Sequence, residues 1–151
     1  MKLNEAFDLL ESLLSKTVKK SEINIYTSFI AILTDLKNRN LSPEELDSIE
    51  KELDHLKPAI NSGNKKKDIR KVLNSFKKFL KEKLSLITEG YYTAIGMGLG
   101  MSFGVAIGTA INVPIGLTMG ISIGMVLGMV IGKNMDLKAE KENRVIKTKT
   151  K

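Results

Sequence analysis

The chain has 151 residues, a net charge of +7, no cysteine and a single histidine, His55. This composition excludes disulfides, thiolate metal sites and a cysteine nucleophile, and it leaves no histidine cluster for a metal or for catalysis. We therefore expect no enzyme activity, no cofactor and no metal site. The length suits one ordinary domain, or a small domain plus a membrane segment.

The charge is unevenly distributed along the chain. Residues 1–56 hold 7 basic and 11 acidic side chains, and residues 57–83 hold 10 basic and 2 acidic ones. Residues 133–151 hold 7 basic and 3 acidic side chains, whereas the 43 residues from 90 to 132 carry no charge. Basic blocks therefore flank a long apolar block on both sides.

Residues 1–89 are predicted to form a cytoplasmic domain, a bundle of about four amphipathic helices. Four successive segments repeat apolar residues at steps of three and four, which is the spacing of one helix face. The first segment mixes acids into this pattern, so no signal peptide is expected. The predicted faces are Leu3, Phe7, Leu10, Leu14 and Val18; Ile23, Tyr26, Phe29, Ile30, Leu33 and Leu36; Leu46, Ile49, Leu53 and Leu56; and Ile69, Val72, Leu73, Phe76, Leu80, Leu84 and Ile87.

The third helix has recognisable limits in the sequence. In the stretch SPEE, Ser42 is the expected N-cap, Pro43 takes the first helical position and Glu45 completes a capping box. Pro58 is expected to end the helix, because proline cannot donate a backbone hydrogen bond. The acidic run EELDSIEKELD is expected to be a solvated face, with docking of a protein partner as the alternative. His55 has no second ligand at a suitable spacing, so it is expected to be a surface residue.

The fourth helix is strongly basic and leads directly into the apolar block. Three interpretations remain open: contact with anionic lipid headgroups, a solvated helix, and nucleic-acid binding. The first is favoured because juxtamembrane lysines are attracted to anionic lipid, whereas no nucleic-acid-binding motif is recognisable. The predicted headgroup contacts are Lys77, Lys78, Lys81, Lys83 and, beyond the apolar block, Lys133.

The apolar block contains ten of the twelve glycines of the chain, within residues 96–132. A dinucleotide-binding loop does not fit, since Met101 stands where the third glycine of G-x-G-x-x-G belongs. A P-loop does not fit either, because GMVIGKN is one residue short and has Asn134 in place of the hydroxyl residue. A flexible linker would be polar, whereas this block is rich in Ile, Leu, Val and Met.

The glycines are periodic, with a step of four residues and one step of eight at the centre. A step of four keeps them on nearly one helix face, which is the small-xxx-small pattern of helices that pack closely in lipid. The predicted helix-packing residues are Gly96, Gly100, Gly104, Gly108, Gly116, Gly120, Gly124, Gly128 and Gly132. A second small face lies about 200° away on the first helix, at Gly98, Ser102, Ala106 and Ala110.

The length of the block predicts a transmembrane helical hairpin over residues 90–132. A single helix of 43 residues would be about 65 Å long, whereas the hydrocarbon core is about 30 Å thick. Asn112, Val113 and Pro114 are the predicted turn, which gives spans at about 91–111 and 115–132. Because both flanks are basic and the turn is uncharged, both termini are expected in the cytoplasm. Residues 133–151 are expected to be a basic cytoplasmic tail that continues the second helix briefly and then frays.

These glycines, followed by the basic tail GKNMDLKAEKENR, resemble those of small bacterial glycine-zipper membrane proteins. The resemblance is specific over about residues 90–144 and loose over residues 1–89. It implies a soluble helical N-terminal part, a two-span glycine-repeat hairpin and a location in the bacterial inner (plasma) membrane. Most members of this group lack an assigned activity, so the resemblance implies an architecture more than a function.

Two functions fit this all-α architecture. The first is an oligomeric integral membrane protein whose hairpin self-associates and forms or gates a pore under control of the N-terminal domain. Ser102, Thr109, Thr118 and Ser122 would give such a pore a mildly polar lining, although no span carries an ionisable residue. The second is a non-enzymatic, membrane-anchored adaptor or scaffold that presents the helical domain to a partner. A soluble protein that buries the glycine helices in its own interior is the third and least favoured alternative.

Overall fold

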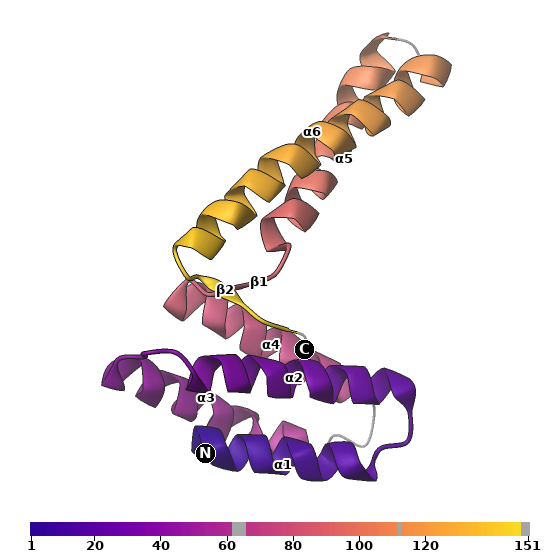
Figure 1. Cartoon of the computed structure of the whole chain (residues 1–151). Helices are drawn as coiled ribbons and strands as arrows, with labels where there is room; N and C mark the ends of the chain where they lie inside the picture. The colour runs from indigo at the N-terminus through magenta and orange to yellow at the C-terminus, as the bar shows by residue number, and fades with distance from the viewer. Residues whose placement is uncertain (62–65, 112, 149–151) are drawn as a thin grey trace. The chain divides into compact units, whose positions relative to one another are not determined.

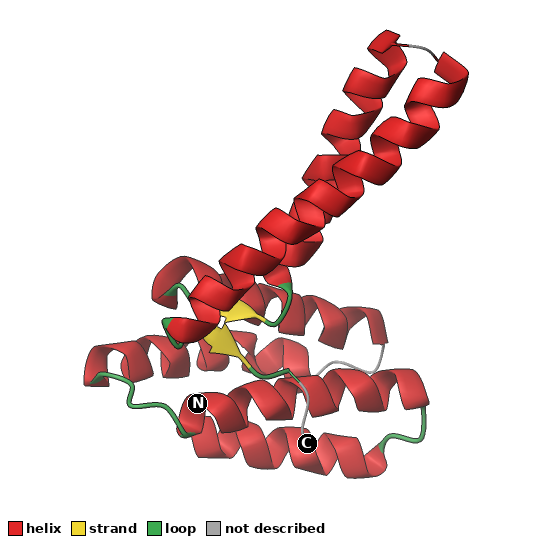
Figure 2. Ribbon diagram, turned by 45° about the horizontal axis from the view of Figure 1, so that its top comes forward, coloured by secondary structure: helices red, strands yellow, loops and turns green. Residues whose placement is uncertain are grey.

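The computed structural model describes residues 1–61, 66–111 and 113–148. Within these ranges the chain is almost entirely helical, and the two short strands form one two-stranded sheet (Figures 1 and 2). The predicted all-α fold, four amphipathic helices followed by an apolar helical hairpin, is confirmed. The elements are α1 (Leu3–Lys16), α2 (Lys20–Lys37), α3 (Pro43–Asn61), α4 (Lys66–Leu84), β1 (Ile87–Thr88), α5 (Tyr91–Ile111), α6 (Val113–Lys141) and β2 (Val145–Ile146).

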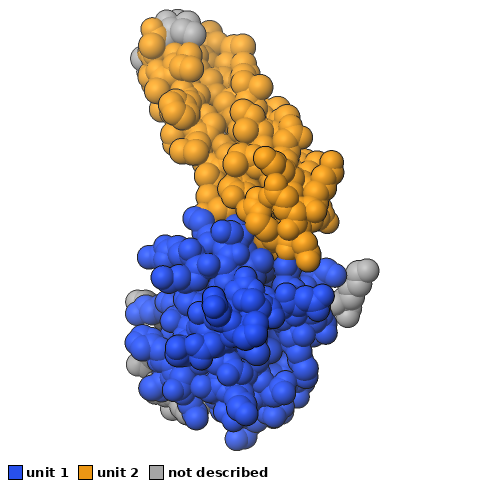
Figure 3. Space-filling view, turned by 90° about the vertical axis from the view of Figure 1, so that its left-hand side faces the viewer, with its two compact units in different colours: residues 1–88, 146–151 blue, residues 89–145 orange. Residues whose placement is uncertain are grey.

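The chain divides into two compact units, coloured separately in Figure 3. The helical unit consists of residues 1–88 and 146–151, and the hairpin unit consists of residues 89–145. The hairpin unit is therefore an insertion, because the chain leaves the helical unit after β1 and returns to it at Ile146.

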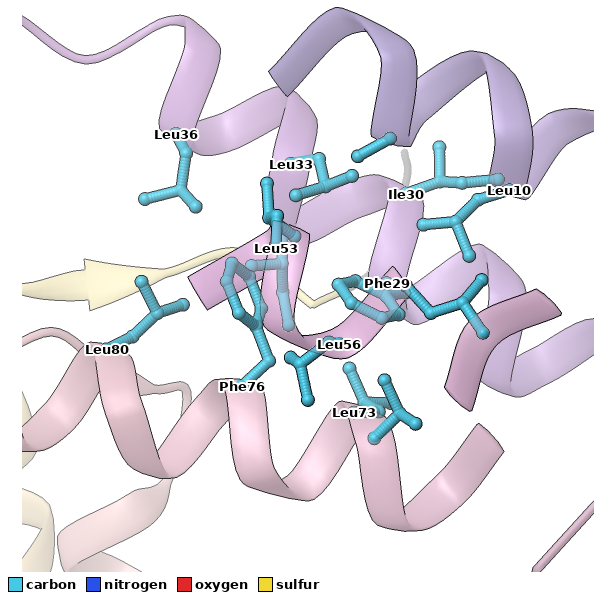
Figure 4. Packing of buried hydrophobic residues seen from close by; sticks show 14 of the residues in the cluster. Leu10, Phe29, Ile30, Leu33, Leu36, Leu53, Leu56, Leu73, Phe76 and Leu80 are labelled. Atoms are coloured by element: carbon cyan, nitrogen blue, oxygen red, sulfur yellow. The ribbon is translucent and has the colours of Figure 1, made fainter. Parts of the chain in front are cut away.

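The helical unit has one hydrophobic core, to which α1, α2, α3 and α4 all contribute (Figure 4). The rings of Phe29 and Phe76 lie at its centre, with their centroids 5.2 Å apart, and both side chains are fully buried. The predicted helix faces supply most of this core. Val18 is an exception, since it lies between α1 and α2 and is 93% exposed.

The third helix begins as predicted and ends later than predicted. The Ser42 backbone N–H donates to Glu45 Oε2 (2.8 Å), and the Glu45 N–H donates to Ser42 Oγ (3.2 Å), which confirms the capping box. The prediction that Pro58 ends the helix is wrong, because α3 continues through it to Asn61. This extra turn buries Ile60 in the core, where it is 1% exposed, and this burial offsets the backbone hydrogen bond that proline cannot make.

As far as residue 148, the last that the structure describes, the C-terminal tail is folded, and over this part the prediction that it frays is wrong. Helix α6 extends to Lys141, and Asn143 then adopts a left-handed conformation (φ 55°). The N–H groups of Asn143 and Arg144 donate to Glu140 O and Ala139 O, both at 2.9 Å, which are the two bonds of a Schellman motif. This helix end directs the chain into β2, whose Ile146 is 1% exposed and belongs to the core of the helical unit.

We predict that Ile146→Ala destabilises the helical unit by about 2–5 kcal/mol, because a buried isoleucine would leave a cavity. Guanidinium unfolding of the full chain in detergent, followed by far-UV circular dichroism, measures this change. Val18→Ala is the control, since that side chain is 93% exposed and its truncation should leave the midpoint unchanged. Equal midpoints for both variants would mean that the tail does not complete the core.

Candidate functional site

The candidate site is the pair of apolar helices in the hairpin unit. By length and composition, α5 and α6 could each cross a membrane, and only 11% of each apolar window is buried. Large apolar side chains point outward along both helices; Phe103 is 67% exposed and Ile131 is 62% exposed. A core helix of a soluble protein would be mostly buried, so this surface is suited to an apolar surrounding.

Helices α5 and α6 run antiparallel (Figure 1). They meet glycine to glycine. A Cβ added at Gly100 would lie 2.8 Å from the carbonyl carbon of Gly124, and one at Gly104 would lie 2.6 Å from that of Gly120. Real Cβ atoms do not approach so closely, so any side chain here would push the helices apart. The same holds for all nine predicted packing residues: Gly96, Gly100, Gly104, Gly108, Gly116, Gly120, Gly124, Gly128 and Gly132.

The glycine pairs have a single register. Gly108 faces Gly116, Gly104 faces Gly120 and Gly100 faces Gly124, so the register is centred on position 112. At each pair, the carbonyl oxygen of one glycine lies where a Cβ of the opposite glycine would be. In glycine, a hydrogen of the Cα atom points in this direction. This is the geometry of Cα–H···O contacts, each of which contributes about 0.5–1 kcal/mol. The pairs therefore replace side-chain packing with direct contact between two backbones.

The predicted turn residues lie at this centre. Val113 and Pro114 are the first two residues of α6, so the helix begins earlier than the predicted position 115. Proline is tolerated in a first turn because the N–H groups there have no intrahelical partner. Asn112 lies outside the described residues.

The second small face of α5 is not brought into the contact with α6. Its four members are exposed, and a Cβ added at Gly98 would meet no atom within 4 Å. Ser102 donates its hydroxyl to Gly98 O (3.0 Å) within the same helix. The face is therefore smooth and has no unsatisfied side-chain donor. It consists of Gly98, Ser102, Ala106 and Ala110.

Three further hydroxyl groups, those of Thr109, Thr118 and Ser122, also bond within their own helix. Thr109 Oγ1 donates to Val105 O (2.9 Å), Thr118 Oγ1 to Ile115 O (3.0 Å), and Ser122 Oγ to Thr118 O (2.9 Å). Such bonds allow a hydroxyl to face hydrocarbon, because its donor is satisfied without water.

One side of the hairpin is an open apolar groove with a volume of about 750 Å³. Glycines form its floor, and the residue that precedes each glycine forms a wall. The α5 wall has Leu99, Phe103 and Ile107, and the α6 wall has Ile115, Met119, Ile123, Leu127 and Ile131. Every wall residue is more than half exposed, so the walls stand clear of the glycine floor.

Asp136 closes the base of the hairpin, and this role was not predicted from the sequence. Its carboxylate accepts from the backbone N–H groups of Tyr92 and Thr93, both at 2.9 Å, and from the Thr93 hydroxyl at 2.6 Å. It thus acts as an N-cap that α6 supplies to α5, satisfying donors that a helix start leaves free. The available signal was its position, four residues after Gly132 and so the next step of the glycine series.

Arg144 adds a second polar contact near the same end. Its guanidinium donates to Glu142 Oε2, and its Nε–Oε2 distance is 2.7 Å. The hydrogen bond to the Glu142 carboxylate, followed by one to the Tyr92 hydroxyl, raises the pKa of Arg144 above its ordinary value.

The structure distributes the predicted headgroup lysines over different environments. Lys77 is half-buried along α4, and this burial lowers its pKa below the ordinary value. Lys78 pairs with Glu82 (3.8 Å), and both side chains are exposed. Lys81 and Lys83 are exposed near the end of α4, and Lys133 is exposed on α6, one residue after Gly132.

Comparison with protein-family models, with curated proteins and with solved structures finds no match. Among the residues that the structure describes, no three His, Cys, Asp or Glu side chains gather at a metal-binding spacing. The hairpin itself therefore remains the basis for a functional assignment.

We predict opposite effects for two glycine substitutions in α5. Gly100→Ala should destabilise the hairpin by about 1–3 kcal/mol, because its Cβ would strike the backbone of Gly124. Gly98→Ala should stabilise it by up to about 1 kcal/mol, because alanine favours helix and the space there is open. Unfolding in mixed micelles by increasing SDS, followed by circular dichroism, gives both values; equal shifts would contradict the glycine contact.

We predict that Asp136→Ala weakens the start of α5 by about 0.5–2 kcal/mol, the usual cost of losing an N-cap. Hydrogen exchange should therefore accelerate at the amides of Tyr92 and Thr93. Glu140→Ala is the matched control, since it removes one exposed acid from the same helix. Unchanged exchange in Asp136→Ala would show that the carboxylate does not cap α5.

Proposed function

We propose that this chain is an integral membrane protein whose α5–α6 hairpin forms a glycine zipper, self-associates in the bilayer and anchors the helical unit. The observation that carries the proposal is the apolar surface of the hairpin: residues 90–132 carry no charge, and only 11% of each apolar window is buried. Helix α5 has 21 residues and is about 31 Å long, close to the thickness of the hydrocarbon core.

The distribution of basic residues supports a location in the bacterial inner membrane with both termini in the cytoplasm. Basic segments precede Tyr91 and follow Gly132, whereas the connection between the helices has no charge. Positively charged flanks stay on the cytoplasmic side during insertion. The hairpin would then reach the far side only at its turn.

Self-association is supported by what the glycine contact leaves exposed. Helix α5 uses one small face against α6, and its second small face, around Ala106, is exposed and has no partner helix among the residues that the structure describes. Small residues let helix backbones approach in lipid, where packing drives association in place of the hydrophobic effect. A helix of a neighbouring copy could pack closely against this face, whereas bulky side chains would keep the two backbones apart.

Two functions remain candidates for the anchored protein. The first is a pore, which is favoured by the hydroxyl groups at Ser102, Thr109, Thr118 and Ser122. Leakage of dye from vesicles tests it, and intact vesicles at a high protein-to-lipid ratio would argue against it.

The second is an adaptor, which is favoured by the separate hydrophobic core of the helical unit. Replacement of residues 90–132 by a foreign two-span anchor would preserve the function of an adaptor and abolish that of a pore.

Membrane insertion is tested by alkaline carbonate extraction and by cysteine labelling. The chain has no cysteine, so Asn112→Cys and Asn134→Cys each introduce a single reactive thiol. We expect the protein to stay in the membrane pellet, with position 112 labelled only from outside and position 134 only after permeabilisation. Release into the supernatant would refute the proposal.

Self-association is tested by fluorescence energy transfer between copies in vesicles. Ala106→Phe should lower the transfer several-fold, because it places bulk on the second small face. Val105→Phe adds the same side chain at the neighbouring position, which lies about 100° away on the helix and is 38% exposed. Equal transfer in both variants and in the unmodified chain would exclude this face as the contact.

A further inference from the structure

Helix α4 has two sides of opposite character. Its apolar side is buried in the core of the helical unit, through Ile69, Val72, Leu73, Phe76 and Leu80. The other side carries exposed cations, with Asn74 exposed between them; positions 71, 74, 78 and 81 follow one another at steps of three and four residues. We call this side the basic face; it consists of Arg70, Lys71, Lys78 and Lys81.

The basic face differs from the set of lysines predicted from the sequence. Lys77 lies on its flank, and its side chain is half-buried, which lowers its pKa. Lys83 follows Phe76 by seven residues and so belongs to the apolar side of the helix. Arg70 and Lys71, in contrast, are exposed on the same side as Lys78 and Lys81.

Helix α4 carries a net positive charge. The helix has eight basic and two acidic residues in its sequence. The pair Lys78–Glu82 is 3.8 Å apart with both side chains exposed, and such pairs contribute little. Helix α3, which packs against α4, has six acidic and two basic residues. The helical unit therefore concentrates its positive charge on one helix.

A short connection joins helix α4 to α5. Six residues, 85–90, separate Leu84 from Tyr91, and they can span at most roughly 25 Å. A second tether joins the units, because four residues separate Lys141 from the buried Ile146. If α5 starts at a membrane surface, the Leu84 end of α4 therefore stays within this reach of the surface.

We infer that the basic face binds the phosphates of anionic lipid headgroups and holds the helical unit on the bilayer surface. The inference rests on the proposed insertion of the hairpin, and charge complementarity selects the partner. An anionic membrane attracts cations within about one Debye length, roughly 8–10 Å. Each cation shifts the equilibrium between bound and free states about fivefold, since the attraction is about 1 kcal/mol.

The first experiment places a fluorescent label on the basic face of the full chain in vesicles. Asn74→Cys provides the attachment site, and acrylamide, a neutral quencher, reports exposure to water. We expect quenching to fall when phosphatidylglycerol is added to phosphatidylcholine vesicles and to recover at high salt. Ser48→Cys on α3 is the control site, exposed on the acidic helix, and its quenching should not change.

The second experiment removes the charge. Neutralising the basic face with Arg70→Gln, Lys71→Gln, Lys78→Gln and Lys81→Gln should abolish the protection of position 74. A matched variant neutralises four exposed lysines elsewhere in the helical unit, with the same change in net charge, and should retain the protection. It carries Lys16→Gln, Lys20→Gln, Lys37→Gln and Lys57→Gln.

The outcomes separate this inference from the proposed function. Protein that resists carbonate extraction but is quenched equally in neutral and anionic vesicles overturns the lipid-binding face alone. Protein released by carbonate overturns both. An oligonucleotide, added to protein in neutral vesicles, could also protect the label at position 74 from acrylamide. If it protects more strongly than phosphatidylglycerol does at the same salt concentration, the inference is overturned and the face is assigned to nucleic acid.

Discussion

The hairpin depends on one constraint, the direct approach of two helix backbones. In the proposed membrane location the hydrophobic effect would give no net attraction between helices, so packing and Cα–H···O contacts would hold α5 against α6. Glycine opposite glycine permits this approach over the whole length of the pair, from Gly108 and Gly116 near the turn to Gly96 and Gly128 near the base. Asp136 completes the contact by capping α5 from α6. The register, the glycines and the cap are therefore parts of one arrangement.

The same four-residue step decides what the hairpin offers to its surroundings. The glycines of both helices face inward. A residue that directly precedes a glycine, such as Phe103, can then form a wall of the groove. In α5, a residue two places after a glycine, such as Ala106, lies on the second small face. Hydroxyl groups on these outer faces are satisfied within their own helices. The surface of the hairpin therefore has a groove and a smooth face, and its hydroxyl donors are satisfied within the helices. Such a surface is suited to contact with apolar chains or with other helices.

The helices and the glycine contact could be predicted because their signal is local and periodic. Asp136 was missed because the apolar pattern stops at Gly132, although the four-residue step continues to it. The strands were missed because two residues, as in Val145–Ile146, have no period, and only the packed core reveals that Ile146 is buried. The prediction that Pro58 ends α3 failed for a similar reason, since the burial of Ile60 outweighs the local preference of proline. The basic face also required the fold, because the burial of Phe76 and its neighbours determines which cations point outward.

The insertion of the hairpin between β1 and β2 has a consequence for the order of synthesis. The ribosome makes α1 to α4 first, then both apolar helices, and Ile146 only after them. The last buried side chain of the helical unit thus becomes available when the hairpin is already complete. A nascent chain would keep its helical unit incompletely packed until the hairpin has left the ribosome. Completion of the helical unit is in this way timed by the hairpin that is inserted in it.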